Sequence, residues 1–235
     1  MRVLRGRAET READGAVTGE LLETAAETEE VGLRVWRPHR QLAFGRRDTR
    51  RNGYERARLA AEERGFPPIV RRVGGRACAY TGRTVAFVRA EPVADARSGL
   101  TERYEAVSEA VQRACWRLGV PAQRGEPPNA FCPGGHSLSA DGKLVGIAQR
   151  VTGGAAMVAG TLIVEDHEAI GGVLEPVYDA LDLDLDPATV SSLSKAGGRT
   201  EWPTIRATLE DALVGEATPR VEQVHAGASE ANPDG

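Results

Sequence analysis

Cys132 and Lys143 are the side chains in this sequence that could together carry out a group-transfer reaction. Cys132 lies in a loop rich in proline and glycine, and Lys143 follows eleven residues later, after an Asp141-Gly142 turn. A hairpin there would bring an ammonium group near the thiol and favour the nucleophilic thiolate. The same ammonium could neutralise the charge that develops on a thioester carbonyl oxygen. His136 lies between them and is a further candidate base for the thiol.

Lysine is rare in this chain, because Lys143 and Lys195 are the only lysines among 30 basic residues. An ammonium is a compact point charge and a guanidinium is a planar fork, so a lysine retained here favours a role that arginine cannot fill. An ordinary structural explanation stays open for both candidates. Cys132 could be a core residue at the end of a loop, and Lys143 a solvated turn residue.

A second stretch with possible chemistry contains Arg71, Arg72, Gly74, Gly75 and Arg76. Adjacent glycines let backbone N–H groups approach a ligand closely, and the arginines supply positive charge for a phosphate or a carboxylate. The stretch is not a phosphate-binding P-loop, since no Gly-Lys-Ser/Thr follows it. A basic turn on the protein surface is the alternative interpretation.

Composition excludes several classes of protein. The 235 residues are 41% hydrophobic and 27% charged, with a net charge of −4, so nothing global indicates binding to nucleic acid or a membrane surface. No apolar run is long enough to span a bilayer and no signal peptide is visible, which predicts a cytoplasmic protein. The three cysteines and four histidines show no spacing typical of a disulfide framework or a metal site. Cys115 lies on the apolar face of a predicted helix and is expected in the core.

The elements that must position these residues mix strands and helices without regular alternation, which predicts an α+β domain over residues 1–215 with an antiparallel-rich sheet. A patternless polar stretch over 216–235 predicts a disordered tail. Residues 1–15 could contain an edge strand, and 84–88 are expected to form a hairpin with the segment that precedes Thr81-Gly82-Arg83. The other predicted strands are 32–36, 41–45, 69–70, 119–122, 138–140, 143–150 and 156–164. The predicted helices are 16–30, a segment between a cap at Asn52 and Gly65, 101–118, 171–181 and 202–214.

Three motifs in fixed order resemble a known family of catalytic domains. They are Arg71-Arg72-Val-Gly74-Gly75, then Gly142-Lys143-Leu-Val-Gly146-Ile-Ala148-Gln149-Arg150, then Gly160-Thr161-Leu-Ile-Val164. In this order they resemble the catalytic domain shared by lipoate–protein ligases, octanoyltransferases and biotin–protein ligases, over roughly residues 32–215. The resemblance implies a central mixed, largely antiparallel sheet flanked by helices, with an acyl tunnel beside the glycine loop.

The resemblance also implies roles for individual residues. Lys143 would contact the acyl carbonyl and, in a ligase, the adenylate phosphate. Cys132 lies where cysteine-dependent octanoyltransferases of this superfamily carry their nucleophile. The residues expected to bind substrate are Arg71, Arg72, Gly74, Gly75, Arg76, Gly146, Ala148, Gln149, Gly160 and Thr161. This chain departs from many ligases in having Gly135-His136-Ser137 where they place an Asn-Asp pair, and Ala159 where they have a histidine.

Three functions follow from the resemblance. The favoured one is acyl transfer, in which Cys132 takes an octanoyl or lipoyl group and passes it to a lysine of a lipoyl domain; this needs no cofactor. The alternative is an ATP-dependent lipoate–protein ligase, which would need ATP with magnesium and could use a separate accessory chain. The third is a non-catalytic module that binds lipoyl domains or acyl chains. The expected partners are lipoyl domains of 2-oxoacid dehydrogenase or glycine cleavage complexes, with acyl carrier protein or free lipoate as the acyl source.

Overall fold

The computed structural model describes residues 1–71, 74–95 and 98–224 and is built around a large mixed sheet. Its eight strands run in the order β11-β1-β2-β6-β10-β9-β8-β7. Their bounds are β1 Arg2–Arg5, β2 Gly32–Trp36, β6 Thr84–Pro92, β7 Gln123–Arg124, β8 Leu138–Ser139, β9 Lys143–Thr152, β10 Ala155–Ile163 and β11 Arg220–Gln223. Strand β1 is parallel to β2 and β11, and the other pairs are antiparallel. The predicted α+β class with a largely antiparallel sheet is confirmed.

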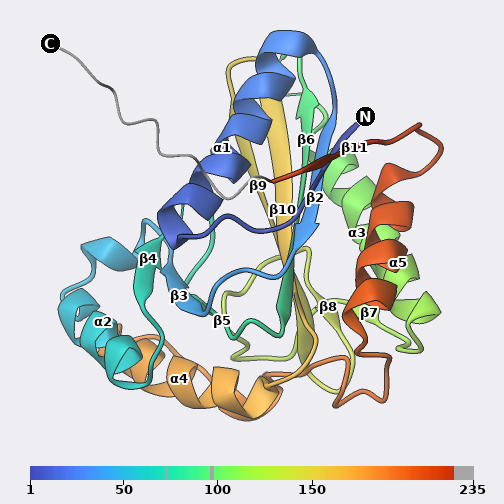
Figure 1. The fold of residues 1–235 in the computed structure, drawn as a ribbon. Coiled ribbons are helices and arrows are strands. Elements are labelled where there is room, and N and C mark those ends of the chain that lie inside the picture. Colours follow the sequence, from blue (N-terminus) through green and yellow to red (C-terminus); the bar gives the residue numbers. More distant parts are fainter. Residues whose placement is uncertain (72–73, 96–97, 225–235) are drawn as a thin grey trace, which may run out of the picture.

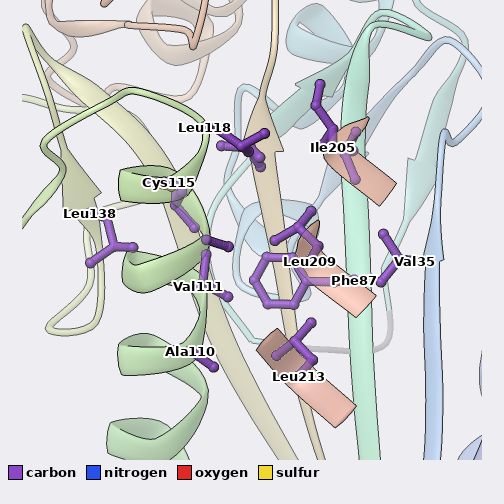
Figure 2. Packing of buried hydrophobic residues seen from close by; sticks show 14 of the residues in the cluster. Val35, Phe87, Ala110, Val111, Cys115, Leu118, Leu138, Ile205, Leu209 and Leu213 are labelled. Carbon is purple, nitrogen blue, oxygen red and sulfur yellow. The ribbon is translucent and has the colours of Figure 1, made fainter. Parts of the chain in front are cut away.

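Helices cover both faces of this sheet (Figure 1). Helix α1 (Arg11–Thr28) packs on one face, whereas α3 (Leu100–Arg117) and α5 (Trp202–Val214) pack together on the other. Figure 2 shows the core between the sheet and the α3/α5 pair, where the ring of Phe87 meets aliphatic side chains of both helices. Because side chains alternate along a strand, Val85 and Phe87 of β6 point into this core, whereas Ala86, Val88 and Ala90 face α1.

A smaller sheet and two more helices form the other side of the molecule. The strand order is β4-β3-β5, with β3 at Gln41–Phe44, β4 at Pro68–Val70 and β5 at Cys78–Tyr80. Helices α2 (Tyr54–Glu63) and α4 (His167–Ala180) pack against each other beside it, and short 3₁₀ turns span Asp48–Arg50 and Pro187–Thr189. The expected hairpin between β5 and residues 84–88 was wrong: β5 pairs with β3, while β6 pairs with β2 and β10. The two strands do not pair because β5 belongs to the smaller sheet and β6 to the main sheet.

Two helices differ in extent from the sequence prediction. Helix α1 begins at Arg11 rather than at 16, because the Thr10 hydroxyl caps it by accepting a hydrogen bond from the Ala13 amide. Helix α4 begins at His167 and continues through Pro176, although proline has no amide hydrogen to donate. Asn52 is not the cap of α2; that position belongs to Gly53, and no side chain caps the helix.

The prediction of a disordered tail over 216–235 was wrong for its first part. Residues 220–223 form β11, which extends the main sheet beside β1, and the ion pairs of Arg220 with Glu30 and of Arg2 with Glu222 support that pairing. Four residues with one apolar side chain carry too little pattern to indicate a strand. Residues 225–235 lie outside the described part. No helix that the structure describes has the length and apolar composition needed to cross a membrane.

Candidate active site

A cavity of about 760 Å³ opens between the α1 face of the main sheet, the smaller sheet and the loop that carries Cys132. Small and apolar residues make its floor, since β9 and β10 place Ala148 opposite Ala159 and Gly146 opposite Thr161. Trp36, Val88 and Met157 continue the apolar lining toward α1. A space of this volume and character suits a small ligand with an extended apolar part.

Cys132 lies on the wall of this cavity in a left-handed backbone conformation, with φ of 43°. Its sulfur accepts hydrogen bonds from Arg71 Nη2 at 3.1 Å and from the Arg76 backbone amide at 3.2 Å. Its own amide donates to the Tyr178 hydroxyl at 2.6 Å, and that hydroxyl donates to the Ala77 carbonyl at 2.9 Å. Two hydrogen-bond donors are thus directed at this one sulfur on the cavity wall.

The guanidinium of Arg71 connects two cysteines. Its Nη1 donates to Cys78 Sγ at 3.2 Å, while Nη2 serves Cys132. Burial by itself would lower the pKa of Arg71, but the charges of the two cysteine sulfurs outweigh it and the pKa is raised. Burial raises the pKa of Cys78 above its usual range, although Arg71 opposes that effect. Cys132, which is less buried, is therefore the better candidate for a nucleophile.

Lys143 stands at the start of β9 and is completely buried beneath the Cys132 loop. Its ammonium donates to Glu126 Oε2 at 2.6 Å, to the Phe131 carbonyl at 2.8 Å and to the Cys132 carbonyl at 2.7 Å. These three contacts match the three donors of an ammonium group. The lysine and the cysteine are thus brought together as the sequence suggested, but the ammonium contacts the cysteine's backbone rather than its sulfur.

The glycine loop forms the cavity wall opposite Cys132. Gly74 and Gly75 both line the cavity, and Gly75 has φ of 104°. A Cβ on Gly75 would lie 2.2 Å from Arg71 Nη2 and 2.6 Å from Cys132 Sγ, so the close approach of these groups requires glycine. Arg76 directs its side chain away from the sulfur and pairs with the buried carboxylate of Asp48 at 3.1 Å. Arg72 lies outside the described residues.

The remaining residues expected to bind substrate are Gly146, Ala148, Gln149, Gly160 and Thr161, all of which line the cavity. His136, the other candidate base, also lines it, but its ring is stacked on Tyr104 with 3.9 Å between centroids. Its Nδ1 lies 3.9 Å from a carboxylate oxygen of Glu105. The structure records no hydrogen bond between His136 and Cys132.

Several residues of the site gave no signal in the sequence. Glu126 and Tyr178 reach the Cys132 loop from other segments, and Cys78 reaches it through Arg71. A carboxylate in a Gly-Glu-Pro turn and a tyrosine on a helix are common surface and core residues. Only the proximity of their segments in the fold identifies them as part of the site.

The ATP-dependent alternative requires protein side chains that contact the adenylate and the metal ion. Over residues 1–71, 74–95 and 98–224, no group of three or more histidine, cysteine, aspartate or glutamate side chains is placed to hold a metal ion. The ammonium expected to contact an adenylate already has its three donors occupied. Magnesium that accompanies a nucleotide is held largely by phosphate oxygens and one or two carboxylates, so ATP-dependent ligation stays the alternative to acyl transfer.

Solved structures with the same fold are lipoate ligases. A crystal structure of lipoate-protein ligase A bound with ATP superposes with a TM-score of 0.74 at 16% identity, covering 95% of this chain and 88% of that one. A bi-partite lipoate protein ligase from Thermoplasma acidophilum, reported with its E2 lipoyl domain, gives 0.69 at 14% identity, covering 95% and 87%. At these identities the likeness establishes the fold.

Sequence relatives carry the name octanoyl-GcvH:protein N-octanoyltransferase. The protein from Exiguobacterium sp. strain AT1b is 29% identical over 192 residues, which is 80% of this chain and 66% of that protein. The protein from Exiguobacterium sibiricum is 30% identical over 134 residues, or 55% and 48%. The chain therefore matches between about half and two thirds of the length of these relatives. The family model for the lipoyl protein ligase A/B catalytic domain matches residues 14–210, and the chain belongs to that family.

Proposed function

We propose that this protein transfers an octanoyl or lipoyl group to a lysine of a lipoyl-domain protein through a thioester on Cys132. The observation that carries the proposal is the placement of the Cys132 sulfur on the cavity wall, where Arg71 and the Arg76 amide both donate to it. A thiolate is the reactive form of cysteine, and fixed donors lower the cost of forming it.

The reaction has two acyl transfers. The Cys132 thiolate attacks the acyl carbonyl of the donor, a C–S bond to Cys132 forms, and the bond to the donor's leaving sulfur or nitrogen breaks as that atom takes up a proton. The neutral amine of the acceptor lysine then attacks the thioester. A C–N bond forms, the C–S bond breaks, the amine loses a proton to water, and the thiolate returns to its place beside Arg71.

The apolar floor gives the acyl chain a place during both steps. Ala148, Ala159 and Met157 offer carbon surface that an eight-carbon chain can cover, and the small side chains of the first two leave it room. The names of the curated relatives include an octanoyl group carried on GcvH and a protein acceptor. We therefore extend to this chain an acyl donor carried by a lipoyl-domain or acyl carrier protein, and a second lipoyl domain as acceptor.

The test supplies one lipoyl domain with three acyl sources in separate mixtures: octanoyl acyl carrier protein, octanoyl-GcvH, and free lipoate with ATP and magnesium. Intact mass spectrometry follows both the acceptor and the enzyme. We expect acceptor modification with a carrier-bound donor, and an acyl adduct on the enzyme when the acceptor is left out. A Cys132→Ala variant should lose both. Modification with the ATP mixture alone, or full activity of Cys132→Ala, would replace the transferase with a ligase.

A further inference from the structure

The carboxylate of Glu126 connects the loop that carries Cys132 to Lys143. One carboxylate oxygen, Oε2, accepts from the Lys143 ammonium at 2.6 Å and from the Ser137 hydroxyl at 2.7 Å. The other, Oε1, accepts from the Gly134 amide at 2.8 Å. The carboxylate thus ties both ends of the segment after Cys132 to the start of β9. The sequence indicated no role for this residue.

Lys143 transmits this hold to the cysteine. Its ammonium also donates to the carbonyl oxygens of Phe131 and Cys132, which belong to the two peptide groups that flank the Cα atom of Cys132. A residue with a side chain at φ of 43° is held there against a conformational cost of about 1–2 kcal/mol, so the surrounding contacts must fix it. The Tyr178 hydroxyl holds the amide of Cys132, and Lys143 holds its carbonyl.

Lys143 and Glu126 act as a unit because they carry opposite charges and form an ion pair. Lys143 is completely buried, and a buried ammonium needs a carboxylate and further hydrogen bonds to offset its desolvation. Glu126 is the carboxylate that pairs with this ammonium, at 2.6 Å. With all three donors occupied in this arrangement, the ammonium has none left for an acyl carbonyl.

We propose that Glu126 is a positioning residue for acyl transfer, which acts through Lys143 to aim the Cys132 sulfur at Arg71 and the Arg76 amide. The inference rests on the proposed function for its meaning in catalysis. It adds a task for Lys143 to the one that the family resemblance implies, because the lysine also fixes the backbone of Cys132.

The first experiment uses Glu126→Gln, which keeps an acceptor oxygen for the loop but removes the charge that pairs with Lys143. We expect kcat to fall by roughly 10- to 100-fold, because a displacement of about 1 Å at a reacting group can cost that much, while the KM for the acyl donor changes less than about threefold. Glu126→Asp, which keeps the charge, should recover part of the loss. Glu109→Gln is the matched control, since Glu109 is an exposed carboxylate of α3 that pairs with Arg113 and Arg124.

A second readout needs no acyl substrate, and it separates failure of this inference from failure of the proposed function. The rate at which iodoacetamide alkylates Cys132 at neutral pH should fall on the order of tenfold in Glu126→Gln, as expected when the sulfur loses one charge-assisted hydrogen bond. Circular dichroism confirms that each variant is folded. An alkylation rate equal to or above that of the parent protein in a folded Glu126→Gln variant would overturn the proposal.

A double-mutant cycle tests whether Glu126 acts through Lys143. If it does, Lys143→Gln and the double variant Lys143→Gln/Glu126→Gln should have kcat values within about twofold of each other, because the second change then removes only the charge, and glutamine keeps an acceptor oxygen for the loop. Independent effects that multiply would show that Glu126 supports the fold by another route. This comparison stays informative if Glu126→Gln folds poorly, because the double variant contains no unpaired buried charge.

Discussion

Cys132 combines the proposed nucleophilic sulfur with a strained backbone. A left-handed conformation costs a residue with a side chain about 1–2 kcal/mol, and the contacts of Tyr178 and Lys143 hold the peptide in place against that cost. The conformation places the sulfur beside Arg71, while Cys132 also packs against the hydrophobic cluster that contains Phe131. The strained conformation therefore lowers the stability of the fold while it orients the Cys132 sulfur.

The strain can be measured by comparing two variants that both lack the sulfur. Cys132→Gly should be more stable than Cys132→Ala by about 1 kcal/mol, since glycine reaches positive φ without a steric cost. At an ordinary helix or strand position the order is reversed. Urea unfolding of both variants gives the difference. If alanine proved the more stable replacement, the loop would be relaxed rather than held.

Arg71 contacts two sulfurs with a planar fork, which a lysine cannot reproduce. We expect Arg71→Lys to slow acyl-enzyme formation by roughly 10-fold or more, because a fixed charge-assisted hydrogen bond to the nucleophile is lost. Quenched-flow mass spectrometry of the enzyme measures the adduct. Arg113→Lys on the exposed side of α3 serves as control and should leave the rate unchanged. Equal rates in both variants would mean that the Arg76 amide alone suffices.

The sequence could indicate candidate residues for the chemistry but not the residues that position them. Cys132 and Lys143 were found from their types and spacing, and the structure places them in adjacent contact. It could not show that the lysine's donors are consumed by Glu126 and two carbonyls, because that depends on how the loop folds over β9. Tyr178 is about 46 residues from Cys132 in sequence, and no local pattern links them.

Among the elements, β10 depends on a glycine that an aromatic ring covers. Gly160 lies opposite Phe87 on β6, and a Cβ there would come within 2.1 Å of the Phe87 ring. Gly146 on β9 also lines the cavity, but the nearest atom to its Cβ would be Lys143 Cε at 3.7 Å. The two glycines therefore differ in what a side chain would meet. At Gly160 it would clash with the core, whereas at Gly146 it would make an ordinary contact beside the cavity.

We expect Gly160→Ala to lower the free energy of unfolding by about 1–3 kcal/mol, the usual cost of overpacking a core. Gly146→Ala should cost less than about 1 kcal/mol, since its methyl group meets ordinary van der Waals distances. Denaturant unfolding measures both. A Phe87→Leu change should recover part of the loss in Gly160→Ala and do nothing for Gly146→Ala. Equal destabilisation by the two alanines would contradict this account.

Local signals decided which elements could be predicted. Helix α5 has the predicted bounds, because Pro203 suits its first turn and Gly215 ends it with φ of 62°. The partner of β5 and the existence of β11 could not be predicted, because both depend on strands far away in sequence. Strand pairing is decided by the whole sheet, and short strands carry little of that information.

At the scale of the whole molecule, the fold buries neutral acids on both sides of the main sheet. Burial raises the pKa of Cys115 to about 12 between α3 and the sheet, and it raises the pKa of Tyr178 on α4. The pKa of Tyr80 beside the cavity is raised for the same reason. Each of these groups is more easily ionised in the unfolded chain than in the folded one.

This difference predicts loss of stability in alkali. Because the folded pKa lies above the unfolded value, the folded state keeps its proton longer, and the stabilisation is complete below the unfolded pKa and lost as pH rises toward the folded one. For Cys115 the window runs from 9.0 to about 12. At pH 10.5 its share of the loss should be about 2 kcal/mol, since one pKa unit corresponds to about 1.4 kcal/mol.

Urea unfolding of the parent protein and of Cys115→Val at pH 8 and 10.5 isolates that share, because valine fills a similar volume and does not titrate. The parent should lose more stability than the variant between the two pH values. Parallel losses would place the titrating groups elsewhere, with the buried tyrosines as the next to be replaced by phenylalanine.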